Sequence, residues 1–121
     1  MHFMYFTEQP MKTYPRAEGE KFGYTALLFS NKNFDATEGS RLYHEFILEY
    51  QRAEAVGFDG IMLNEHHQAP FCMQAVTNMM AAVLSYATHK AKIVILGNPL
   101  PRADNPTRLS EELAMIDMYS Q

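Results

Sequence analysis

Apolar residues in this sequence form two kinds of pattern that alternate along the chain. Short continuous runs have the length and character of strands that are covered on both faces. Longer segments repeat apolar positions at the spacing of an amphipathic helix. The runs are residues 2–6, 60–63 and 93–96, and the helical segments are residues 40–56, 73–88 and 106–120. Strand and helix thus alternate three times, which predicts an α/β fold with a parallel sheet and right-handed crossovers.

The apolar positions of each helical segment predict the face that packs on the sheet. The first face comprises Tyr43, Phe46, Ile47 and Tyr50. The second comprises Ala75, Met79, Ala82, Val83 and Tyr86, widened by Met80 and Leu84. The third comprises Leu109, Leu113 and Ile116.

Capping residues predict where two of these helices begin and end. Ser40 is the candidate N-cap of the first helix. Gly57 is its expected stop, because glycine readily takes the left-handed conformation that closes a helix. Asn105 and Pro106 predict the start of the third helix, with Asn as N-cap and Pro at the first helical position.

Residues 9–39 are the least regular part of the sequence, rich in Pro, Gly and charged residues. Their only apolar run is residues 26–29. A structureless loop of this length is uncommon in a compact domain and often has a function. We expect a lid or substrate loop above the first strand, with an ordinary surface excursion as the alternative.

Polar or Gly/Pro clusters follow all three predicted strands. They are Glu8-Gln9, Asn64 to His67, and Gly97-Asn98. The carboxyl ends of parallel strands meet at one edge of a sheet, where α/β proteins and barrels bind their ligands. We therefore expect a functional site at this edge, although solvated loops also gather polar groups.

Composition narrows the classes of function. The 121 residues carry a formal net charge of −4 with scattered basic residues, so no nucleic-acid footprint is evident. No apolar run approaches the length of a membrane span, and we expect no signal peptide. The single cysteine, Cys72, excludes an intrachain disulfide. These features predict a cytoplasmic protein.

The chemistry of Glu65, His66 and His67 has several possible interpretations. All three are metal-ligand types, but neighbours on an extended segment point to opposite sides, so we expect no metal site. Motifs for a zinc protease, a nucleophilic serine, a dinucleotide or a phosphate loop are missing from the sequence. An acid–base histidine remains, because imidazole titrates near neutral pH and a neighbouring carboxylate can orient it.

Two motifs, in this order and at this separation, resemble one family. The first is Gly57 to His67, with the sequence GFDGIMLNEHH. The second comprises residues 97–101 (GNPLP), 105–109 (NPTRL) and 111–117 (EELAMID). Together they resemble the bacterial-luciferase-like, flavin-dependent monooxygenases. The resemblance covers residues 40–121 well and residues 1–8 loosely.

This resemblance implies an enzyme built on a TIM (β/α)8 barrel. Such an enzyme uses reduced FMN and O2, through a C4a-hydroperoxyflavin, to oxygenate a small organic substrate. A flavin reductase would supply the reduced FMN, and members are often dimers through their first helices. An F420-dependent oxidoreductase of the same barrel group is the alternative.

The resemblance also implies roles for particular residues. His66 matches the active-site imidazole, which acts as an acid–base group beside the flavin. Glu65, Gly97 and Asn98 are expected at the cofactor, with Glu65 orienting His66 or lying at the edge of the flavin. Asn64 and His67 are expected in the substrate pocket. In the family the peptide bond at the end of the third strand is often non-prolyl cis.

The length of the sequence matters for this interpretation. Eight βα units take about 250 residues, and these 121 residues supply three. We expect residues 1–121 to be the N-terminal part of such a barrel. Open strand edges and uncovered apolar surface then predict a chain that associates with itself or a partner, or that folds poorly. A non-catalytic remnant or assembly module without flavin is the alternative.

Overall fold

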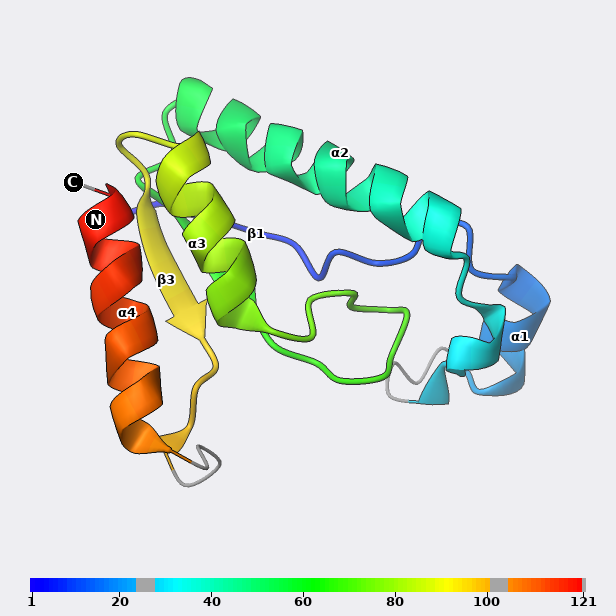
Figure 1. Cartoon of the computed structure of the whole chain (residues 1–121). Helices are drawn as coiled ribbons and strands as arrows, with labels where there is room; N and C mark the ends of the chain where they lie inside the picture. The colour runs from blue at the N-terminus through cyan, green and yellow to red at the C-terminus, as the bar shows by residue number, and fades with distance from the viewer. Residues whose placement is uncertain (24–27, 101–104, 121) are drawn as a thin grey trace.

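A computed structural model describes residues 1–23, 28–100 and 105–120, in which three parallel strands carry helices on one face (Figure 1). The strands lie in the order β1 (Met4–Phe6), β2 (Gly60–Asn64) and β3 (Lys92–Leu96). The helical elements are α1 (Arg16–Lys21), η2 (Asn31–Asn33), α2 (Ala36–Ala55), α3 (Thr77–Ala87) and α4 (Pro106–Ser120). The predicted α/β class and the parallel sheet are confirmed.

The register of the sheet decides which side chains face the helices. Ile61 of β2 pairs with Tyr5 and Ile93, and Leu63 pairs with Ile95. All five belong to the core that packs beneath the helices, and Ile61 and Leu63 are 0% exposed. Because side chains alternate along a strand, the other set faces away from the helices. That set comprises Met4, Phe6, Met62, Val94 and Leu96.

Helix α2 packs as the sequence predicts. Phe46 and Tyr50 are buried, and Tyr43 and Ile47 pack against the same core. Leu42 joins them with no exposed surface. The apolar stripe of this helix is narrow, so only one orientation buries it.

The predicted face of α3 is confirmed at Met80 and Leu84 and is wrong at Met79, Val83 and Tyr86. Met79 is 69% exposed and Tyr86 84%, whereas Met80, Ala81 and Leu84 are buried. Apolar residues run without interruption from Met79 to Leu84, so periodicity could not select a face. Tertiary contacts select it instead, since the buried Thr77 hydroxyl donates to the Asn64 carbonyl at 2.9 Å.

Three helix boundaries test the capping predictions. Helix α2 begins at Ala36, because Asp35 Oδ1 accepts from the backbone N–H groups of Thr37 (2.9 Å) and Glu38 (3.0 Å). The predicted start at Ser40 is therefore wrong. Gly57 follows the helix with φ +98°, and Asn105 Oδ1 accepts from the first turn of α4, so both of these predictions are confirmed.

Helix α3 begins at Thr77 rather than at residue 73. The backbone before Thr77 makes a hydrogen bond outside the helix, because Met73 N–H donates to the Gln9 carbonyl at 3.1 Å. That bond joins the β2–α3 connection to the segment after β1. The prediction of a longer helix missed this long-range contact.

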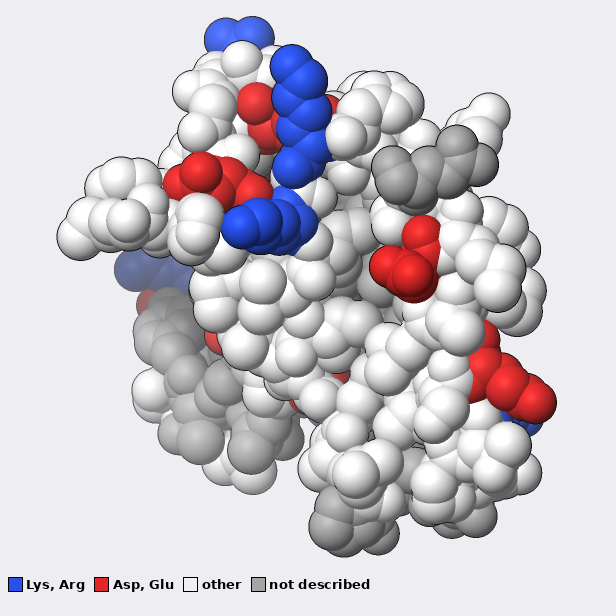
Figure 2. Space-filling model, turned by 90° about the vertical axis from the view of Figure 1, so that its left-hand side faces the viewer, with Lys and Arg blue, Asp and Glu red and all other residues white. Residues whose placement is uncertain are grey.

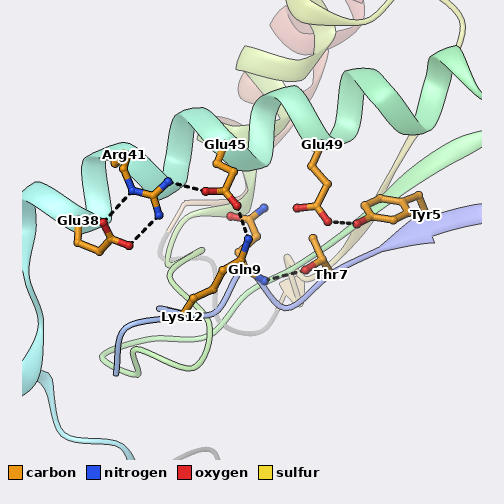
Figure 3. Close-up of polar contacts among 8 residues, drawn as sticks. All are labelled: Tyr5, Thr7, Gln9, Lys12, Glu38, Arg41, Glu45 and Glu49. Atoms are coloured by element: carbon orange, nitrogen blue, oxygen red, sulfur yellow. Dashed lines mark hydrogen bonds and ion pairs between the residues drawn. The ribbon is translucent and has the colours of Figure 1, made fainter. Parts of the chain in front are cut away.

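The segment from 9 to 39 contains more regular structure than expected, namely α1, η2 and the first turn of α2. An ion pair between Lys12 and Glu45 joins this segment to α2, and within the helix Arg41 donates to both Glu38 and Glu45 (Figure 3). The predicted apolar run at 26–29 falls partly outside the described residues. Its role as a lid or substrate loop stays a prediction.

The charged surface shows no basic patch on the face drawn in Figure 2, where Lys and Arg side chains lie next to Asp and Glu. None of the described helices combines the length and apolar character needed to cross a membrane.

Candidate active site

The tails of the three strands meet at the carboxyl edge of the sheet. Asn64 Nδ2 donates to Glu8 Oε2, which joins the tail of β2 to that of β1. A Cβ built on Gly97 would lie 3.3 Å from Glu65 Cβ, so the tail of β3 reaches the same place. The structure thus brings the three polar clusters together.

Asn64 is the buried centre of this edge, with only 6% of its surface exposed. Its Oδ1 accepts from Cys72 Sγ at 3.5 Å, and its carbonyl accepts from the side chains of Thr77 and Gln74. Every polar group of its side chain has a partner among the described residues. Asn64 therefore lies beneath the site and orders its neighbours.

His66 stands at the surface of the site. Its Nε2 lies 3.7 Å from Glu8 Oε2, and its ring centroid lies 5.0 Å from that of Phe71. Its backbone N–H donates to the Gln74 carbonyl at 3.2 Å, which fixes the main chain. The side chain is 34% exposed, so the imidazole is accessible to a ligand.

His66 lines a pocket of about 330 Å³. The walls come from η2 and the residues after it, from α2, and from the β2–α3 connection. They comprise Asn31, Phe34, Tyr43, Gln68, Ala69, Pro70, Cys72, Met73 and Ala75. The lining is largely apolar. Its titratable groups are the imidazole of His66, the thiol of the buried Cys72 and the phenol of Tyr43.

Glu65 and His67 lie on the other side of the strand tail. His67 Nε2 is 3.1 Å from Glu65 Oε1, and Glu65 Oε2 accepts from the backbone N–H and the hydroxyl of Thr77. Partial burial opposes ionisation of Glu65, but the bonds from Thr77 and His67 outweigh it and lower its pKa. Glu65 is therefore a carboxylate with its charge engaged away from His66.

A second pocket of about 530 Å³ lies on this side, lined in part by Glu65, His67, Asn98, Arg108 and Glu112. The two histidines thus face different pockets, as expected for neighbours on an extended segment. Within the described residues, no group of three or more His, Cys, Asp or Glu could hold a metal ion.

Asn98 turns toward the helices. Its backbone has φ +62°, and its Nδ2 donates to Asn78 Oδ1 at 2.6 Å. Asn78 in turn donates to Glu112 of α4 at 2.8 Å. Every peptide bond in the described part of the chain is trans, so the cis bond that the resemblance suggested after β3 is not found there.

A family model described as luciferase-like monooxygenase matches residues 21–121. The chain belongs to the luciferase-like monooxygenase family. Searches of curated proteins and of solved structures each found no match. The family implies a TIM barrel, and three consecutive βα units on a parallel sheet are consistent with part of one. Members commonly bind a flavin or F420.

The residues of this luciferase-like chain fit the ring end of such a cofactor. The sheet face that lacks helices is apolar, with Phe6 42% and Leu96 48% exposed, and polar groups stand at its carboxyl edge. A planar ring system needs this combination of an apolar floor and a few polar partners. Among the residues that line the two pockets, Arg108 is the sole Lys or Arg, and it pairs with Glu112 at 3.0 Å. Among these described lining residues, the fit therefore does not extend to a phosphate.

Sequence reasoning missed Glu8 as the partner of His66. It grouped Glu8 with the strand-end residues but assigned the orienting role to Glu65. The two residues of the pair are 58 positions apart, and only the parallel register of β1 against β2 brings them together. Gln9, next to Glu8, is fully buried, and its Oε1 has no hydrogen-bond partner among the described residues.

Proposed function

We propose that this chain forms part of a flavin-dependent monooxygenase that oxygenates a small organic substrate, with His66 as its acid–base group. Family membership supports an oxidoreductase of the monooxygenase type. The observation that carries the finer proposal is the accessible His66 imidazole between a carboxylate and a largely apolar pocket. Bound reduced flavin would supply the two electrons with which O2 yields an oxygenated product and water.

The chain's own residues have three tasks in this proposal. His66 accepts or delivers a proton at its ring nitrogen, within reach of the sheet edge and the pocket. Phe34 and Tyr43 offer aromatic walls for the apolar body of a substrate. The pocket volume of about 330 Å³ suits a small molecule. Glu65, Gly97 and Asn98 remain the proposed neighbours of the cofactor. Of the two residues proposed for the substrate pocket, Asn64 would act from beneath the site and His67 from the second pocket.

The proposed partners follow from the same chemistry. Reduced FMN would come from a separate flavin reductase, because these residues offer no recognisable nicotinamide-binding motif. F420 is the alternative cofactor, and nothing in these three units separates the two. A cytoplasmic location and a homodimer complete the proposal.

A second candidate function, an assembly module without flavin, is favoured by one observation. Large apolar side chains are exposed along α3 and α4, which suits association with another surface. They comprise Val76, Met79, Val83, Tyr86, Met115, Met118 and Tyr119.

Flavin binding discriminates between the two candidates. The protein is titrated with oxidised FMN, and in parallel with oxidised F420, while quenching of the cofactor's fluorescence and mass by light scattering are recorded. Saturable quenching of FMN supports the oxygenase, whereas tighter binding of F420 supports the alternative oxidoreductase. A colourless, associating protein with no quenching favours the assembly module.

The role of His66 has its own test. His66→Ala should leave flavin binding largely intact and slow oxygenation about 10²–10⁴-fold, as expected for the loss of one acid–base group. His44→Ala, at an exposed position on α2, is the matched control and should keep its rate. An unchanged rate in His66→Ala removes this residue from the mechanism.

A further inference from the structure

Glu8 stands beside the imidazole that the proposed function uses. Its Oε2 lies 3.7 Å from His66 Nε2, which is the distance of an ion pair rather than of a short hydrogen bond. We infer that Glu8 is the positioning residue of His66 and that Asn64 in turn holds Glu8. This inference rests on the proposed function only in that His66 is taken to handle a proton.

Asn64 gives the Glu8 carboxylate a fixed place. Its Nδ2 donates to Glu8 Oε2, the same oxygen that faces His66. Two sets of contacts hold Asn64 in this orientation: Cys72 Sγ donates to its Oδ1 at 3.5 Å, and the side chains of Thr77 and Gln74 donate to its backbone carbonyl and fix the main chain. The order of contacts therefore runs from the buried sheet edge through Asn64 and Glu8 to His66.

Glu65, the acid next to His66 in sequence, does not compete for this role. Its Oε1 faces His67 and its Oε2 accepts twice from Thr77. Both oxygens are thus engaged on the far side of the strand tail. Phe71 limits the His66 ring from another direction, with centroids 5.0 Å apart.

Glu8 also influences the thiol of Cys72, which belongs to the same cluster. Burial raises the pKa of the Cys72 thiol, and the negative charge of Glu8 raises it further. A carboxylate held beside one ring nitrogen orients the imidazole and leaves the other nitrogen to face a ligand.

The first test needs no cofactor. The protein is labelled with ¹³C and ¹⁵N on histidine, and the ring resonances of His66 and His67 are compared in wild type, Glu8→Gln and Glu65→Gln. We expect Glu8→Gln to displace the His66 signals and leave those of His67, and Glu65→Gln to do the reverse. Unmoved His66 signals in Glu8→Gln overturn the inference.

The remaining histidines report on folding in the same spectra. His2, His44 and His89 lie outside the cluster and should keep their positions. If Glu8→Gln does not fold, Glu8→Asp replaces it, because it keeps the charge and withdraws it by one methylene. Displacement of the His66 signals alone is again expected, and its absence overturns the inference.

The second test uses the flavin-loaded protein. Glu8→Gln should lower kcat about 10-fold with KM unchanged, less than the loss of the acid–base group itself. In a His66→Ala background the same substitution should add nothing, because Glu8 acts through His66. An equal loss in both backgrounds overturns the inference. Failure of wild type to bind flavin contradicts the proposed function, while the resonance comparison still decides the role of Glu8.

Discussion

The two faces of the sheet are built from similar residues and have different surroundings. On the helix-covered face, Ile61 and Leu63 have no exposed surface. On the open face, Phe6 of β1 is 42% exposed and Leu96 of β3 is 48% exposed, although the sequence predicts both strands as apolar runs covered on both faces. The apolar character of a strand therefore predicts that both of its faces need cover. It does not predict that the helices of this chain cover both faces. The covered face holds the fold together, whereas the open face keeps large apolar side chains exposed.

Neighbouring positions on β2 give the sharpest test of this difference. Leu63→Ala should reduce the free energy of unfolding by about 2–5 kcal/mol, because it leaves a cavity in packed core. Met62→Ala, on the open face, should cost about 1 kcal/mol. Urea unfolding followed by circular dichroism measures both. Equal losses would mean that the open face is covered in solution, which repeating the measurement over a range of protein concentrations would reveal.

Gly60 lies on the open face at a position with no room for a side chain. A Cβ there would lie 2.5 Å from the Lys92 carbonyl oxygen and 2.6 Å from Met4 Sδ. The thioether can move but the neighbouring backbone cannot, so Gly60→Ala should destabilise by about 1–3 kcal/mol. Thermal unfolding is the measurement, with Val94→Ala on the same face as the control. An unchanged unfolding temperature in Gly60→Ala would show that β1 and β3 can move away from β2.

The cover itself depends on where α2 begins. Asp35 caps the helix by accepting two backbone N–H groups, whereas Ser40 lies in its second turn. Asp35→Ala should therefore cost about 1 kcal/mol, and Ser40→Ala should be close to neutral. Chemical denaturation of the two variants compares them directly. The opposite order would restore the start that the sequence alone suggested.

The fold was predictable wherever one local pattern had no rival. Alternating strands and helices, the stripe of α2 and the Asn105 cap each rest on neighbouring residues. The start of α2 was missed because Asp35 offers an earlier cap than Ser40. The face of α3 was predicted only in part, at Met80 and Leu84, because residues 79–84 are all apolar and contacts with the sheet decide which of them are buried.

The position of the site was predictable from the sequence, but the partner of His66 was not. Parallel strands must bring their carboxyl ends together, so the edge that carries His66 followed from the order of elements. The partner of His66 depends on register, which joins Glu8 to a residue far along the chain. Sequence neighbours on an extended segment point apart, and this is why Glu65 meets His67 instead.

Glu54 offers a pH-dependent test of the covered side. Its Oε1 accepts from the backbone N–H groups of residues 89, 90 and 91, at 2.8, 2.6 and 2.8 Å, and so clamps the α3–β3 connection to α2. Burial opposes its ionisation, but these bonds outweigh it and lower its pKa. A lowered folded-state pKa stabilises the fold above the pKa of the unfolded chain, and this contribution is lost as pH falls through the folded-state value.

Glu54→Gln should therefore cost about 0.5–1 kcal/mol at neutral pH, a value kept small because the group is partly exposed to solvent. The gap between wild type and variant should close as the pH is lowered below about 4, the range in which an ordinary glutamate is protonated. Denaturant midpoints at a series of pH values measure it. Glu111→Gln, on the exposed side of α4, should show no such gap. A gap that persists in acid would mean that Glu54 acts through the shape of its side chain, and its charge would then have no part in holding the helices on the sheet.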